Sequence, residues 1–351
     1  MTKQLRYITS AFLTLLLLHS CQEEIALDES NQISFTTSVQ DQTSISRATI
    51  FENQNDILND AADGKGGGNL TMHAYVRNTG TERFEDRAWY FNGVWRFYDA
   101  SSNKFYNHYW PNYRMDFFAY MPWSGSQRRK YITVGNYTQG TGLTINCTMQ
   151  ETTNLEDVDG QETIIAYTPD KHKETVNLHF VHPFAAVSFE LKQAHRNLTI
   201  NWIRFNNVYL TGTTTLNATT ESNTQITWSP TGSTSSFTIP VNKKIPDDIN
   251  FGAKIGGPYL VMPQSLTSAT ITINYHWDNQ KNADDPVTGD EDTNTNNEIY
   301  QIKRTLTGNW LAGNKYNYVL NLGDNKEEIL FYVEVEPWDV TGGNNNIFDV
   351  E

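Results

Sequence analysis

Histidine and acidic residues are the most obvious side chains in this 351-residue sequence that could hold a metal ion. His179 and His182 lie three residues apart in a strand-like segment, and this spacing points two side chains to opposite faces of a strand, too far apart to share one ion. Residues 290–301 begin like a calcium-binding loop, but Thr295 stands where that loop needs glycine, and Gln301 where it needs a bidentate acid. The sequence therefore predicts no metal site.

Motifs of nucleophilic catalysis and phosphate binding are also missing. Gly64–Asn69 is rich in glycine, yet it lacks the GK[ST] ending of a phosphate-binding loop and precedes a strand-like segment instead of a helix. No GxSxG or HExxH motif occurs. Carboxylates are abundant, so a glycosidase pair stays open, without positive support. We therefore predict that the protein is not an enzyme and uses no cofactor.

The N-terminus has the order of a secretory signal. Two basic residues precede an eight-residue, mainly apolar run, Ala11 to Leu18. A span across a bilayer needs roughly 20 apolar residues, so residues 1–20 are predicted to be a signal peptide and not an anchor. Leu18-His19-Ser20-Cys21 resembles the lipobox of bacterial lipoproteins, which implies that the Cys21 thiol is acylated. The alternative is an ordinary secretory peptide followed by a chance cysteine.

Cys147 is the one other cysteine of the chain. If Cys21 carries lipid, Cys147 has no partner, which excludes a disulfide framework. It lies on the apolar face of the alternating segment Leu143–Met149. We therefore predict a small buried hydrophobic side chain and not a reactive thiol.

The composition favours an exported, strand-rich protein. The chain has 26 basic and 40 acidic residues, and removing residues 1–20 takes away two basic ones, leaving 24 − 40 = −16. A surface this negative repels nucleic acid and anionic lipid, so neither is an expected partner. An aromatic content of 13%, with many Thr and Asn residues, favours sheets over helices.

Residues 21–47 form a distinct N-terminal segment. Ile33, Phe35, Thr37 and Val39 alternate with polar residues, which predicts a half-buried first strand. No Lys or Arg occurs between Cys21 and Arg47. A trypsin-like cut after Arg47 would remove this strand and leave unpaired backbone groups on the sheet, which another chain could fill. The alternative is that Arg47 merely lies in a connection between strands.

The rest of the chain reads as a series of short strand-like segments bounded by Gly, Asn, Asp and Pro. They include Ala88–Tyr98, Gln225–Trp228 and Ala185–Leu191, the last with Ala185, Val187, Phe189 and Leu191 on its expected core face. This pattern predicts an all-β fold of two antiparallel β-sandwiches in tandem, over residues 48–174 and 175–351. The polar stretch Thr168–Thr175 is the expected boundary.

Several motifs, in order and spacing, resemble the fimbrillin-like (Mfa-like) lipoproteins of anaerobic Gram-negative bacteria. Together with the lipobox and Ser46-Arg47-Ala48-Thr49 they extend over nearly the whole chain. They are Trp89-Tyr90-Phe91-Asn92-Gly93-Val94-Trp95, residues 116–122, residues 178–192, Leu260-Val261-Met262-Pro263-Gln264, residues 310–318 and residues 333–338.

This resemblance implies two transthyretin-like sandwich domains and a pilus subunit that supports adhesion. The lipoprotein would reach the outer membrane through lipid on Cys21, and an arginine-specific protease would cut between Arg47 and Ala48. A strand from another fimbrial subunit would then fill the vacated place in a cell-surface fimbrium. The sequence names no receptor. Pro183, which follows His182, departs from the family pattern and could restrict the next strand to a sheet edge or its first residue.

A surface glycan-binding lipoprotein is the alternative function. Trp89, Trp95, Trp110 and Trp123 could stack on sugar rings, although tryptophans of a sandwich more often pack in its core or at its edges. A hydrolase is the third class considered.

Overall fold

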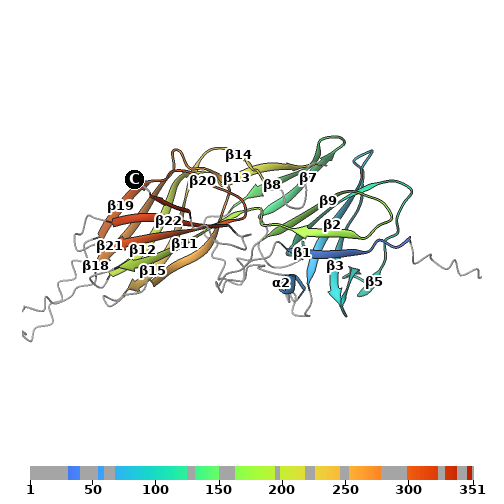
Figure 1. Ribbon diagram of the computed structural model, residues 1–351, viewed down its shortest axis with the longest axis horizontal. Helices are drawn as coiled ribbons and strands as arrows, with labels where there is room; N and C mark the ends of the chain where they lie inside the picture. The colour runs from blue at the N-terminus through green and yellow to red at the C-terminus, as the bar shows by residue number, and fades with distance from the viewer. Residues whose placement is uncertain are drawn as a thin grey trace, which may run out of the picture.

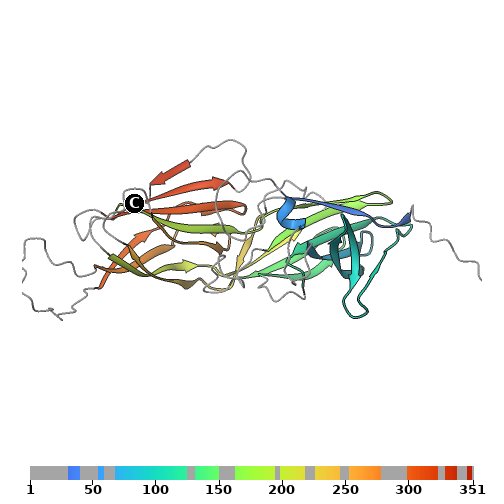
Figure 2. The ribbon, with the colours of Figure 1, turned by 90° about the horizontal axis from the view of Figure 1, so that it is seen from below.

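The computed structural model is an elongated molecule with two lobes along its longest axis, built almost entirely of β-strands (Figures 1 and 2). This confirms the predicted all-β fold. Among the described residues the only α-helix is the short α2 (Gln54–Leu58). The structure describes residues 31–39, 54–58, 68–124, 131–149, 163–193, 198–217, 226–245, 253–277, 299–322, 329–337 and 346–349.

A six-stranded antiparallel sheet is the base of the N-terminal lobe. Every residue of its inner strand β6 is buried, because the near-continuous apolar sequence MDFFAYM supplies both faces. The sheet is therefore covered on both sides. In spatial order its strands are β5 (Lys104–Tyr106), β4 (Val94–Asp99), β3 (Glu82–Phe91), β2 (Asn69–Val76), β6 (Met115–Met121) and β9 (Ile164–Lys171).

Two strands, β1 (Phe35–Val39) and β10 (Val176–Phe180), cover one face of this sheet as a parallel pair. Their apolar side chains form one core with Ile57 of α2 and with alternate residues of β2, namely Leu70, Met72 and Ala74. The strand predicted upstream of Arg47 is therefore present and belongs to the N-terminal lobe.

A four-stranded sheet covers the other face. Its order is β14 (Ser229–Thr231), β13 (Thr211–Leu216), β8 (Gly142–Thr148) and β7 (Ile132–Thr138). The core beneath it contains Tyr75 and Tyr120 of the six-stranded sheet and extends to Phe184, Ala186 and Met262. One apolar core therefore joins the two lobes.

The C-terminal lobe is a sandwich of a five-stranded and a four-stranded sheet. The first has the order β16 (Ala253–Val261), β11 (Ala185–Gln193), β21 (Asn314–Leu322), β22 (Ile329–Pro337) and β23 (Asn346–Asp349), and the second β15 (Ser235–Ile245), β12 (Leu198–Val208), β18 (Thr270–Trp277) and β19 (Ile299–Thr305). β11 and β21 pair in parallel and the other neighbours are antiparallel. A short pair, β17 (Gln264–Ser265) and β20 (Asn309–Trp310), completes the lobe.

Strand β11 is buried on both faces at its start. The predicted core face, residues 185, 187, 189 and 191, lies in the core of the C-terminal lobe. Phe184 and Ala186 point the other way, into the core that joins the lobes. Pro183 precedes β11, which is an inner strand between β16 and β21. The expected restriction to a sheet edge is therefore wrong, and Pro183 itself lies just before the first residue of the strand.

Two predicted strands need correction. Residues 88–98 are not one strand, because Asn92 and Gly93, with φ of 52° and 82°, turn the chain between β3 and β4. Positive φ at both positions is typical of a tight hairpin turn, for which Asn-Gly is a preferred sequence. Residues 226–228 are not in a strand, and β14 begins after them at Ser229.

The predicted division at residues 174 and 175 stays a prediction. Strands from beyond it contribute to the N-terminal lobe, since β10 pairs with β1 and β13 pairs with β8. The polar stretch 168–175 contains the end of β9 and the turn that leads to β10.

Candidate functional site

Backbone hydrogen bonds join the β1 segment to the N-terminal lobe in two places. Its five residues pair in parallel register with β10, beginning with Phe35 opposite Val176. Just before β1, the amide of Ile33 donates to the carbonyl of His108 at 2.8 Å. Among the described residues, β10 has no other ladder partner than β1. This pairing therefore satisfies the edge of β10.

Two apolar side chains of the β1 segment are buried against the sheet. Ile33 is 3% exposed and Phe35 is 7% exposed. The Phe35 ring centroid lies 5.7 Å from that of Trp95 and 5.6 Å from that of Phe97. Burying an Ile or Phe side chain contributes about 1.5–3 kcal/mol. We call β10 together with Trp95 and Phe97 the β1-binding surface.

Polar side chains of β1 bond to their neighbours along the strand pair. The Thr36 hydroxyl donates to Oδ1 of Asn177 at 2.8 Å, and Ser38 Oγ lies 2.9 Å from Nδ1 of His179. These contacts join residues that are directly opposite in the ladder. Exposed hydrogen bonds of this kind add little free energy, but they favour the observed register.

The structure does not test the residues predicted to be lipidated or cleaved. Cys21, Arg47 and Ala48 lie outside the described residues, so lipidation and cleavage stay predictions. The predicted period-two pattern is present in the strand itself, where Phe35 is buried and Thr36 and Ser38 are exposed.

Cys147 is a buried free thiol, as predicted, with 2% exposure. Burial raises the pKa of this thiol, because the thiolate would lose its hydration. His179 lies on β10, beside Ser38, whereas His182 follows the strand and is buried. Cys147 and His182 are therefore buried side chains of the fold, and His179 contacts Ser38 of β1.

The four tryptophans considered for sugar stacking take part in packing. Trp89 and Trp110 are buried, and buried rings cannot stack on a sugar. The Trp95 indole nitrogen donates to the Thr37 hydroxyl at 3.1 Å. The guanidinium carbon of Arg87 lies 4.1 Å from the centroid of Trp123. These contacts give the glycan-binding alternative no support.

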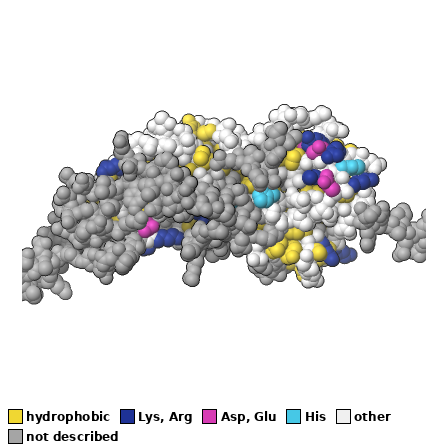
Figure 3. Space-filling model, viewed as in Figure 1, with side chains coloured by type: hydrophobic (Ala, Val, Ile, Leu, Met, Phe, Trp, Pro, Cys, Tyr) yellow, Lys and Arg dark blue, Asp and Glu magenta, His cyan; other side chains and the backbone are white. Residues whose placement is uncertain are grey.

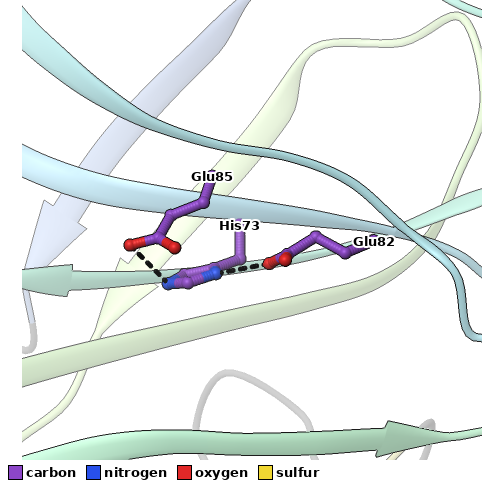
Figure 4. Close-up of side chains that lie close together, drawn as sticks. All are labelled: His73, Glu82 and Glu85. Carbon is purple, nitrogen blue, oxygen red and sulfur yellow. Dashed lines mark hydrogen bonds and ion pairs between the residues drawn. The ribbon is translucent and has the colours of Figure 1, made fainter.

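Three side chains that could together bind a metal ion lie close in space, although their spacing in the sequence does not indicate it. His73 of β2 and Glu82 and Glu85 of β3 have ligand atoms within 4.8 Å of one another (Figure 4). A β-bulge between the pairs Ala74–Phe84 and Tyr75–Glu82 leaves Arg83 unmatched. The bulge turns Glu82 to the face that Glu85 occupies, although residues three apart otherwise face opposite sides.

This group borders a hollow of about 570 Å³ between the six-stranded sheet and β7. Burial, and then the charge and hydrogen bonding of Glu82, raise the pKa of the Tyr75 phenol. The carboxylates of Glu82 and Glu85 are the acidic groups among the described residues that line the hollow. The hollow is lined by His73, Tyr75, Gly80, Glu82, Glu85, Tyr120 and residues 132–137.

The face of the molecule in Figure 3 has acidic, basic and histidine side chains close together over the N-terminal lobe, and hydrophobic side chains at the lower edge of this lobe.

No helix among the described residues is both long enough and apolar enough to traverse a bilayer.

The chain is similar to known proteins in sequence and in structure. The sequence model of the fimbrillin-like family matches residues 72–338. A fimbrial protein from Bacteroides vulgatus has a similar structure, with a TM-score of 0.56 at 14% identity, covering 88% of this chain and 99% of that one. The tip fimbrial protein Mfa3 from Porphyromonas gingivalis, with a C-terminal truncation, gives a TM-score of 0.40 at 9% identity, covering 88% and 100%. No curated protein sequence matches the chain.

Proposed function

The chain belongs to the fimbrillin-like family and is a subunit of cell-surface fimbriae that functions in adhesion, and we propose that it joins its fibre by strand exchange at the β1-binding surface. Its role in this proposal is structural and not enzymatic. Other fimbrial subunits are its partners.

The position of β1 is the observation that carries this proposal. Among the described residues, β1 is one of two strands that cover a face of the six-stranded sheet, and it lies upstream of Arg47 and Ala48. A cut between these two residues separates β1 from the rest of the chain. Its release would leave the backbone groups of β10 without their partners and expose the rings of Trp95 and Phe97.

A strand from another subunit has the chemistry to replace β1. Backbone hydrogen bonds to β10 would supply affinity, and alternate apolar side chains would occupy the places of Ile33 and Phe35. β23 is a candidate donor, because it lies at the edge of its sheet and pairs only with β22 among the described strands.

The N-terminal segment would control when this surface opens. In the proposal, lipid on Cys21 holds the exported chain at the outer membrane while β1 still covers its own lobe. Cleavage after Arg47 then removes the lipid and the strand in one step, since both lie in residues 21–47. The subunit is released as it becomes able to polymerise.

Digestion of the purified full-length chain with an arginine-specific protease tests the proposal. We expect a product that begins at Ala48 by N-terminal sequencing and forms SDS-resistant oligomers. Arg47→Lys keeps the charge but resists this protease, so it should stay monomeric. Excess synthetic peptide of residues 31–39 should suppress assembly, and the same peptide with Phe35→Asp should not. A product that begins at Ala48 and stays monomeric would refute strand exchange.

A further inference from the structure

His73, Glu82 and Glu85 have the arrangement of a metal-binding group. The side chain of His73 is 5% exposed, whereas those of Glu82 and Glu85 are 44% and 50% exposed. Nδ1 of His73 lies 2.7 Å from Oε1 of Glu82, and Nε2 lies 4.0 Å from Oε1 of Glu85. Figure 4 shows the imidazole between the two carboxylates.

The Nε2 atom of His73 is buried and has no hydrogen-bond partner among the described residues. Leaving a buried polar atom unsatisfied is unfavourable. A neutral imidazole that donates its Nδ1 proton to Glu82 directs the lone pair of Nε2 toward Glu85. Two electron-pair donors then face each other, which is unfavourable unless a cation binds both.

The geometry points to a site for one divalent transition-metal ion, with Zn²⁺ as the best fit, bound by His73 Nε2 and Glu85. Glu82 is the positioning residue, because ligating histidines typically donate their other N–H to a carboxylate. In a tetrahedral zinc site with bonds of about 2.0–2.2 Å, two ligand atoms lie about 3.3–3.5 Å apart, so Oε1 of Glu85, now 4.0 Å from Nε2 of His73, has to approach by about half an ångström. Glu85 is half exposed and free to close the angle at the ion.

The residues that line the hollow also favour the binding of a cation. No Lys or Arg is among the described residues that line the hollow, so the charges of Glu82 and Glu85 are not neutralised within it. The hollow of about 570 Å³ has room for water molecules to complete the coordination shell. A mixed imidazole and carboxylate donor set favours zinc-like ions over Ca²⁺ and Mg²⁺, which prefer oxygen ligands alone.

This site is separate from strand exchange. His73 lies on the face of β2 opposite the alternate residues Met72 and Ala74, which pack in the core beneath β1. A bound ion would join β2 to β3 next to the bulge. Metal binding can therefore fail while strand exchange succeeds, or the reverse.

Calorimetric titration of the full-length chain with ZnCl₂, after removal of metals with a chelator, tests the inference. We expect one tight Zn²⁺ site per chain, with an affinity at least ten-fold lower in His73→Gln and in Glu85→Gln, and roughly ten-fold lower in Glu82→Gln.

His108→Gln is the matched control. His108 also pairs with a carboxylate, Asp86 at 2.6 Å, but it has no second acid in a metal-binding group. This variant should bind Zn²⁺ like the wild type. Equal binding by the wild type and His73→Gln, or an equal loss in His108→Gln, would overturn the inference. If His73→Gln does not fold, the half-exposed Glu85→Gln decides the outcome alone.

Discussion

In the C-terminal lobe a five-stranded sheet packs on a four-stranded sheet, whereas the described strands that cover one face of the six-stranded sheet in the N-terminal lobe are β1 and β10. All strands of the C-terminal sandwich lie downstream of residue 184. β1 lies upstream of Arg47. If the chain is cut after Arg47 as proposed, the core of the N-terminal lobe loses one of its strands, whereas the core of the C-terminal lobe keeps all of its described strands.

This difference shows how a folded subunit can open a binding surface without unfolding. The six-stranded sheet keeps its second covering layer, the sheet of β7, β8, β13 and β14, when β1 is absent. The core that joins the lobes lies on that side and has no residue from β1. On the proposed cleavage, loss of β1 would expose the β1-binding surface and leave the core that joins the lobes intact.

The largest loss of stability is expected for a substitution in the core of the C-terminal lobe. Phe205 of β12 is fully buried, and its ring centroid lies 5.0 Å from that of Phe237 and 5.1 Å from that of Trp310. Phe205→Ala should lower the free energy of unfolding by about 3–5 kcal/mol. Urea denaturation should show this loss in the uncut protein and equally in the protein cut after Arg47. A loss confined to the uncut form would contradict the comparison between the lobes.

Phe35→Ala tests the core of the N-terminal lobe, to which β1 contributes. Phe35 is slightly exposed at 7%, so we expect about 3 kcal/mol of destabilisation in the uncut protein, the lower end of the range for such a change. After cleavage the effect should vanish, because residue 35 has left with the N-terminal segment. The exposed Thr36→Ala is the control and should change stability by less than about 0.5 kcal/mol. Equal losses before and after cleavage would show that β1 stays bound.

The same contrast explains what the sequence could predict. β1 was predictable because Ile33 and Phe35 alternate with polar residues, a local signal. Its parallel partner β10 lies about 140 residues away along the chain, and no local pattern encodes that pairing. β13 has no such local signal, because TGTTTL has few apolar residues, and its pairing with β8 determines its conformation.

The candidate metal group was missed for a different reason. Strict alternation along β3 places Glu82 and Glu85 on opposite faces, and only the bulge at Arg83 brings them together beside His73. His179 and His182 have the same spacing, which by strict alternation also separates them. Spacing along a strand is therefore a sound guide only where the pairing is regular, and a bulge is fixed by tertiary structure.

The smallest expected effect lies in the turn between β4 and β5, at the outer edge of the N-terminal sheet. Asp99 accepts hydrogen bonds from the hydroxyls of Ser102 and Ser101, at 2.6 and 2.7 Å, and from the amide of Ser101 at 2.9 Å. These bonds favour the carboxylate and lower the pKa of Asp99 to about 2.

Because the pKa of Asp99 is lower in the folded protein than the value of about 3.9 for an unfolded chain, its contribution to stability is present above pH 4 and is lost as the pH falls through about 2. An NMR titration should give a midpoint near 2 for its carboxyl carbon, and a higher one in the Ser101→Ala, Ser102→Ala double variant, which loses the two hydroxyls but keeps the amide bond of Ser101. The turn is local, so cleavage after Arg47 should leave the midpoint unchanged. A shift on cleavage would show that the loss of β1 is transmitted through β4 to the sheet edge, and that the N-terminal lobe rearranges as a whole.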